Sequence, residues 1–103
     1  ALARARRFTE RARARCVELG YGFVASYLVG SRARGDYMVH SDIDVVLVLR
    51  GVKSLNMLER IYMFKDILEP GLDLRVYDVE EWLDDSNPWI REMRREAVEL
   101  AHG

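Results

Sequence analysis

Three aspartates downstream of a glycine-serine turn are the residues of this chain best suited to chemistry. Asp42 and Asp44 open the apolar run Val45–Leu49, and Asp73 lies in a second apolar run. A carboxylate at the end of a buried strand costs free energy unless a positive group meets it. A divalent metal ion is the positive group that these aspartates suggest.

The spacing of the aspartates fits such a metal site. Side chains two residues apart on a strand share a face, so Asp42 and Asp44 would project together while Ile43 points into the core. Two adjacent carboxylates repel each other, and a cation relieves that repulsion. Mg²⁺ prefers oxygen ligands and is often held by one or two carboxylates plus substrate phosphates. With Asp73 on a neighbouring strand, three carboxylates could hold two metal ions of the kind that stabilise phosphoryl transfer.

The turn that precedes the aspartates could bind phosphate. Gly30 and Ser31 are expected to lead into a short helix that ends near Gly35. Backbone N–H groups at the start of a helix bind phosphate, and a glycine lets phosphate approach the backbone closely. The Ser31 hydroxyl is a further donor, and Arg32 or Arg34 could pair with phosphate oxygens. Turn and aspartates together predict a site for a nucleoside triphosphate.

Each part of this pattern also has a purely structural explanation. Ser41, Asp42 and Asp44 could serve a turn, because serine and aspartate favour turns, and Asp73 could be a strand-edge residue. The glycine spacing of Gly30–Gly35 matches a P-loop, but the lysine and hydroxyl residue that must follow are absent. The apolar residues after Asp44 exclude a calcium loop. The conjunction of turn and aspartates, in this order, favours the nucleotide site.

The elements that position these residues alternate between helices and strands. Apolar residues at intervals of three and four predict the first helix, and short β-branched runs predict the strands. The order predicts an α/β (α+β) fold, a small sheet of about three main strands with helices packed on it. The expected elements are helices at Leu2–Leu19, Leu55–Leu68 (capped by Ser54) and Pro88–Ala101 (capped by Asn87, with Trp89 and Met93 on its apolar side), a helical turn at Val79–Leu83, and strands at Phe23–Val29, Asp42–Leu49 and Leu72–Tyr77.

Length and composition set the broad class. The 103 residues, half of them hydrophobic, predict a single domain over 1–103 with one core. The net charge of −1 gives no argument for nucleic-acid binding. The single cysteine, Cys16, excludes an internal disulfide and is expected in the core. No apolar run approaches the roughly 20 residues that span a bilayer, and no signal-peptide pattern is present, so a cytoplasmic protein is expected.

The motif resembles a known superfamily. The pattern resembles that of the nucleotidyltransferases that include DNA polymerase β and kanamycin nucleotidyltransferase. It consists of Gly30-Ser31, ten further residues, Asp42-x-Asp44 and a later strand aspartate. The chain is most similar to the minimal nucleotidyltransferases of prokaryotes, over nearly its whole length. The resemblance implies a mixed sheet with helices on one side. It also implies Mg²⁺-dependent transfer, with two ions beside the bound nucleotide, of a nucleoside monophosphate to an acceptor hydroxyl.

The resemblance implies a role for each residue of the motif. Gly30 and Ser31 would hold the triphosphate. Asp42 and Asp44 would bind metal. Asp73 would be the third metal-binding carboxylate and would help the acceptor hydroxyl lose its proton. Arg75, on the same strand face as Asp73, could contact phosphate or form a surface ion pair.

The resemblance also implies partners. Minimal members leave little surface for an acceptor pocket, and many are encoded beside a helical toxin of the HEPN type, which points to ATP as donor and a protein as acceptor. An alternative is an antitoxin that neutralises its partner by contact, for which the arginine-rich face of the first helix offers a surface if that face is more than a solvated one. A small-molecule nucleotidyltransferase is a third option, which the lack of a second domain argues against. Homo-oligomerisation stays open.

Overall fold

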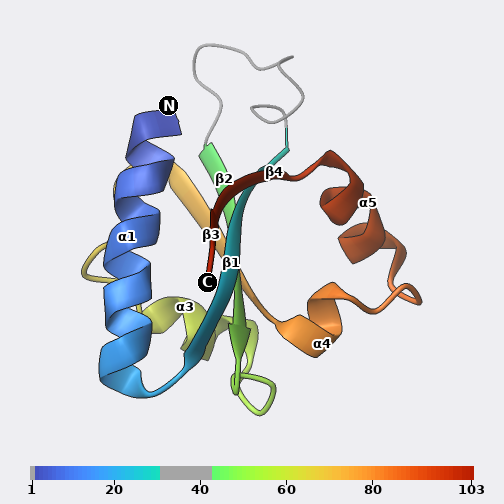
Figure 1. Cartoon of the computed structure of the whole chain (residues 1–103), viewed down its shortest axis with the longest axis horizontal. Coiled ribbons are helices and arrows are strands. Elements are labelled where there is room, and N and C mark those ends of the chain that lie inside the picture. The colour runs from blue at the N-terminus through green and yellow to red at the C-terminus, as the bar shows by residue number, and fades with distance from the viewer. Residues whose placement is uncertain (1, 31–42) are drawn as a thin grey trace.

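The computed structural model describes residues 2–30 and 43–103, so Ser31, Arg32, Arg34 and Asp42 lie outside the described residues, as does the turn and short helix expected there. Eight elements are described (Figure 1). They are α1 (Leu2–Leu19), β1 (Gly22–Val29), β2 (Ile43–Arg50), α3 (Met57–Tyr62), β3 (Leu72–Asp78), α4 (Val79–Trp82), α5 (Pro88–Glu96) and β4 (Val98–His102). The expected first helix, three strands and helical turn are confirmed to within one residue at each end.

The strands form one mixed sheet in the order β3-β2-β1-β4. β2 and β3 are parallel, whereas β1 is antiparallel to both β2 and β4. A parallel pair needs a long crossover, and the segment that carries α3 provides it. The predicted mixed α/β class is therefore confirmed, and the sheet gains a short fourth strand.

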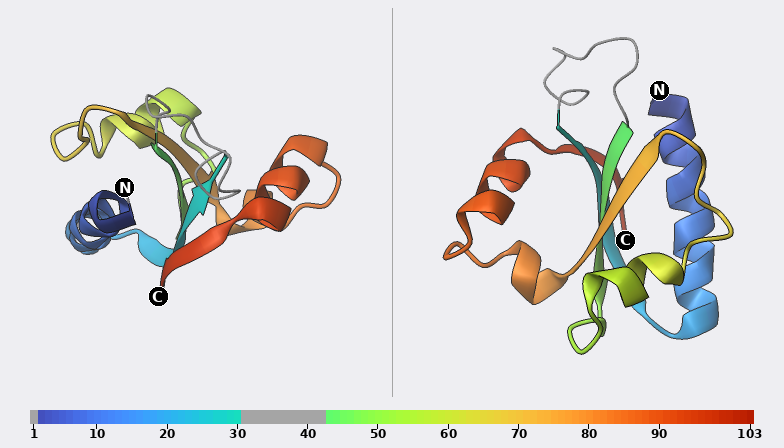
Figure 2. Two further views of the ribbon diagram at one scale, coloured as in Figure 1. Left: turned by 90° about the horizontal axis from the view of Figure 1, so that it is seen from above. Right: turned by 180° about the vertical axis from the view of Figure 1, so that it is seen from behind.

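Helices cover both faces of the sheet, so the arrangement on one side that the resemblance implied is wrong. In both views of Figure 2, α1 and α3 lie on one side of the strands, and α4 and α5 lie on the other. On the first face, Leu47 and Leu49 of β2 pack in one cluster with Phe8. On the second face, Val46 and Val48 pack with Trp82 and Ile90. β2 is thus buried on both sides, which explains its unbroken apolar run.

The last element differs from the prediction. The helix that was expected to reach Ala101 ends at Glu96, and Val98–His102 forms β4 instead. Ala97 already has extended backbone angles (φ −64°, ψ 137°). The segment pairs with the edge of β1, where unpaired strand groups supply hydrogen-bond partners. That edge is far away in the sequence, so the local apolar spacing could not reveal it.

The middle helix is shorter than Leu55–Leu68, and its cap is Asn56 rather than Ser54. The Asn56 side chain accepts the N–H of Glu59 at 2.8 Å, and the Glu59 carboxylate accepts the N–H of Asn56 at 3.0 Å. This reciprocal capping box satisfies two N–H groups that a helix start leaves without partners. After α3, turns rather than a continuous helix carry the chain onward to β3.

Part of the arginine-rich face of α1 is used within the fold. Arg15 makes a two-pronged ion pair with Asp66, with N–O distances of 2.9 and 2.7 Å, and Arg7 contacts Glu69 at 3.2 Å. The hydrogen bond from Arg15 lowers the pKa of Asp66 to about 2. Cys16 is buried, as predicted. None of the described helices is long and apolar enough to cross a membrane.

Candidate active site

Two of the three predicted carboxylates lie side by side on the sheet. Asp44 near the start of β2 pairs in register with Asp73 near the start of β3. Residues paired in this way project to the same face. That face is the one covered by α4 and α5, because Val46, two residues after Asp44, packs there against Trp82. Ile43 is buried in the opposite core, as expected.

Gly30 lies directly against Asp44. The preceding residue, Val29, is the β1 partner of Asp44, and Gly30 itself has a left-handed backbone (φ +76°). A Cβ atom at Gly30 would come within 2.4 Å of Oδ2 of Asp44. Real Cβ atoms do not tolerate such a contact, so glycine is needed here both for the backbone conformation and for the position of the Asp44 carboxylate.

Arg75 brings positive charge to the same face. It lies two residues after Asp73 on β3, and its guanidinium is 4.0 Å from the Asp73 carboxylate. Both side chains are about half exposed, so solvent screens this pair and it contributes little to stability. Arg75 therefore forms the surface ion pair that the sequence analysis gave as one alternative, but the pair is long. The guanidinium remains accessible to an anionic ligand.

A cavity of about 550 Å³ lies between α5 and the strand residues Gly30, Asp44 and Arg75. Its volume falls in the range of about 300–1,000 Å³ that is usual for small-molecule sites. One part of the lining is polar and comes from the strands, with Gly30, Asp44 and Arg75. The other part is largely aromatic and apolar, and the complete lining is Val29, Gly30, Asp44, Arg75, Tyr77, Trp89, Glu92, Met93 and Glu96.

Comparison with known proteins identifies the family. The model of the nucleotidyltransferase domain family matches residues 9–97, which include Gly30, Asp44 and Asp73. The chain belongs to this family. A solved structure, that of a candidate nucleotidyltransferase from Sulfolobus solfataricus, shares the fold with a TM-score of 0.74. The two sequences are 28% identical, and the match covers 95% of this chain and 77% of the other. No curated protein matches the chain.

Family membership makes this a nucleotidyltransferase enzyme, one that transfers a nucleotidyl group from a nucleotide substrate. Nucleotidyltransferase domains generally use divalent metal ions. Within residues 2–30 and 43–103, no group of three His, Cys, Asp or Glu side chains is close enough to hold a metal. Asp44 and Asp73 nevertheless place two carboxylates on one face, and carboxylate oxygens are the donors that Mg²⁺ prefers. The donor set of this candidate site therefore fits a hard divalent cation.

The aromatic side of the cavity was missed by the sequence interpretation. Trp89 was expected to pack on the apolar side of the last helix, but its side chain is 81% exposed and lines the cavity. Tyr77, two residues beyond Arg75, lines it from β3. The ring of Tyr77 stacks on buried Trp82 with centroids 6.0 Å apart, and burial raises the pKa of the Tyr77 hydroxyl. The alternation of Asp73, Arg75 and Tyr77 was the available sign that all three share one face.

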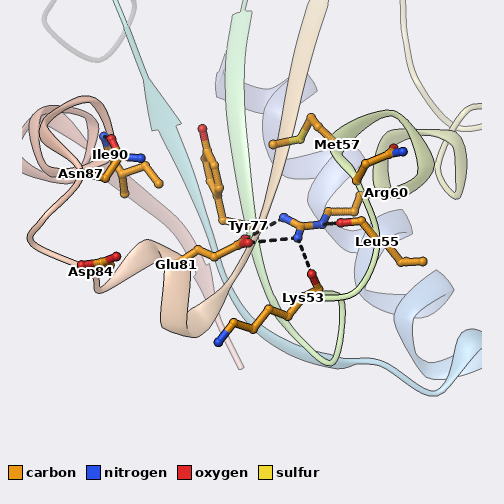
Figure 3. Close-up of a pocket in the computed structure, with 10 residues that line it drawn as sticks. Lys53, Leu55, Met57, Arg60, Tyr77, Glu81, Asp84, Asn87 and Ile90 are labelled. Atoms are coloured by element: carbon orange, nitrogen blue, oxygen red, sulfur yellow. Dashed lines mark hydrogen bonds and ion pairs between the residues drawn. The ribbon is translucent and has the colours of Figure 1, made fainter.

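A second cavity, of about 450 Å³, lies between α3 and α5 and also borders Tyr77 (Figure 3). Its wall contains Arg60, which is only 5% exposed. The guanidinium donates to the backbone carbonyls of Val52, Leu55 and Val76 and makes a two-pronged contact with Glu81 at 2.7 and 3.1 Å. The hydrogen bond from Arg60 lowers the pKa of Glu81. Arg60 thus ties α3 to α4 through Glu81 and to β3 through the Val76 carbonyl, so we assign it a structural role in holding Tyr77.

Proposed function

We propose that the domain transfers the nucleoside monophosphate of a nucleoside triphosphate, with ATP as the donor, to an acceptor hydroxyl and releases pyrophosphate. The observation that carries the proposal is the register of Asp44 with Asp73 on one sheet face, with Gly30 against Asp44. This arrangement supports the interpretation of the motif as a working site, because Gly30 and Asp44 line one cavity and Asp73 is the strand neighbour of Asp44.

The proposed triphosphate site begins at the end of β1. Gly30 and Ser31, with Arg32 or Arg34, hold the phosphates through backbone N–H groups, a hydroxyl and a guanidinium. Arg75, which lines the cavity from β3, adds a positive charge that favours the polyphosphate over a neutral ligand. The triphosphate then lies beside the two strand aspartates.

Asp42, Asp44 and Asp73 are the proposed ligands for Mg²⁺. When bound, the ions neutralise charge on the phosphate oxygens. In the proposed reaction the acceptor oxygen bonds to the α-phosphorus, and the bond from that phosphorus to the oxygen bridging to the β-phosphate breaks. Asp73 takes the proton of the acceptor hydroxyl, and pyrophosphate leaves with the bonding electrons.

The proposed acceptor is a hydroxyl on a protein, with a helical partner of the HEPN type as the first candidate. The remaining exposed arginines of α1 supply a surface on which such a partner could dock. An antitoxin that acts by contact alone would use the same surface without transfer.

The test is transfer of label from ATP. The protein is incubated with MgCl₂, ATP labelled in the α-phosphate, and a lysate or the candidate partner. A variant with Asp42→Asn and Asp44→Asn should lose transfer. A control with Glu80→Gln and Glu99→Gln removes the same charge from exposed positions outside α1 and the cavity and should keep transfer. Equal label with both variants would refute the proposal, and partner neutralisation without any label would support the contact antitoxin.

A further inference from the structure

We propose that Trp89 is the platform on which the purine ring of the nucleoside triphosphate stacks, with Met93 and Tyr77 lining the same apolar part of the cavity. This inference rests on the proposed function, because it assumes that the triphosphate lies at the Gly30–Asp44 side. It goes further by naming the residue that binds the base rather than the phosphates.

One face of α5 is turned toward the cavity. The residues of α5 that line it are Trp89, Glu92, Met93 and Glu96, which follow the spacing i, i+3, i+4 and i+7 of a single helix face. Ile90, one residue further along, is only 6% exposed and packs in the core beneath. The helix therefore buries one side in the protein and presents a second, part-aromatic side to the cavity.

The backbone of Trp89 is fixed although its indole is free of the core. The side chain of Asn87 accepts the N–H groups of Trp89 at 3.0 Å and Ile90 at 3.2 Å, and Pro88 supplies the first residue of α5. Trp89 is nevertheless the most exposed large hydrophobic residue of the described part of the chain. Tryptophan is usually well buried, so an exposed indole on a held backbone beside a cavity is suited to cover a ligand.

The charges around the cavity orient the nucleotide. Gly30 and Arg75 lie on the strand side, where backbone N–H groups and a guanidinium attract phosphate. Asp44 also lies on the strand side, where a bound Mg²⁺ would offset its charge. Glu92 and Glu96 lie on the α5 side, where no proposed metal offsets their negative charge, although Glu92 also pairs with Arg95 at 3.7 Å. The neutral base therefore belongs at α5 and the phosphates at the strands. Carboxylates accept hydrogen bonds from the N–H groups of a base edge, which further favours a base on this side.

The test measures binding rather than activity, with MgATP and inorganic triphosphate (with MgCl₂) as the two probes in calorimetry. Stacking of a base on an aromatic side chain contributes about 1–3 kcal/mol, so Trp89→Ala should weaken MgATP binding by about 5- to 150-fold. Trp89→Phe should retain most of the affinity. Neither variant should change the affinity for triphosphate, which has no base. MgATP should also quench the fluorescence of Trp89, whereas Trp82, only 3% exposed, should respond little.

Controls separate this inference from the proposed function. Leu58→Ala removes another exposed apolar side chain, 79% exposed on α3, and should leave MgATP binding unchanged. Asp44→Asn should weaken both MgATP and triphosphate. Unchanged MgATP affinity in Trp89→Ala, or equal losses for MgATP and triphosphate, would overturn the stacking inference alone. Failure of the wild type to bind either probe would overturn the proposed function and this inference with it.

Discussion

Replacing Gly30 with alanine tests whether the close approach of β1 to Asp44 sets up the site. Gly30 has φ +76°, and a Cβ atom there would lie 2.4 Å from Oδ2 and 3.3 Å from Cγ of Asp44. Gly20, at the end of α1, provides a matched control, since its φ is +82° and no atom lies within 4 Å of the added Cβ. The two substitutions impose the same backbone strain, but only the first one pushes on a carboxylate.

The expected effects differ between stability and function. A left-handed conformation costs an L-residue about 1–2 kcal/mol, so both variants should unfold more easily by that amount. For a domain of this size, each kcal/mol lowers the melting temperature by about 4–8 °C. The Cβ atom of Gly30→Ala must also displace the Asp44 carboxylate, and a misplacement of about 1 Å at a reacting centre can cost about 100-fold in rate. Transfer should therefore fall about 100-fold in Gly30→Ala and stay near wild type in Gly20→Ala.

The assay pairs thermal unfolding with the transfer of label from ATP, and transfer is measured well below the melting temperature. Circular dichroism before the assay confirms that each variant is folded. If Gly30→Ala transfers label within twofold of Gly20→Ala at equal stability, Asp44 does not need its present position and the reasoning fails. A melting temperature that is unchanged in Gly20→Ala would refute the strain estimate instead.

Further predictions concern the packing beneath the site. Arg60→Met should destabilise the fold by about 3 kcal/mol in urea unfolding, because it leaves the Glu81 carboxylate and several carbonyls without their donor; a loss below about 1 kcal/mol would contradict this. Because Arg60 lowers the pKa of Glu81, the stability from this pair is complete above the ordinary pKa of 4.5 and is lost as the pH falls through the lowered value. Glu81→Gln should therefore flatten the acid side of the stability profile, and an unchanged profile would count against the pair. Phe8→Ala should cost about 3–5 kcal/mol, measured in the same way, because the ring is fully buried. Burial raises the pKa of Cys16 to about 11, so iodoacetamide should label this thiol slowly at neutral pH until urea unfolds the chain, and rapid labelling of the folded protein would show that the helix opens.

Local sequence signals were sufficient where the physical cause is itself local. The apolar patterns predicted β1, β2 and β3 within one residue, because a strand buried on both faces is apolar along its length, whereas a strand buried on one face alternates apolar and polar residues. Asn87 and Pro88 marked the start of α5, since a cap and a first-turn proline act on adjacent backbone groups. The family was likewise indicated by the spacing of Gly30, Asp44 and Asp73, whose roles in the site stay a prediction.

Tertiary structure decided how these parts meet. No local pattern sets the register that places Asp44 beside Asp73, because it depends on how the crossover through α3 returns the chain to the sheet. No local pattern predicts β4 either, because it becomes a strand only by pairing with the edge of β1. The contacts of Arg60 are equally non-local, since its partners Val76 and Glu81 lie 16 and 21 residues away. The sequence by itself determined the family motif, and from it the side chains that we predict to bind a metal and phosphate. The packing of α5 against the sheet decided that Trp89 faces that site rather than the core, because helix direction and rotation are fixed by contacts between distant segments.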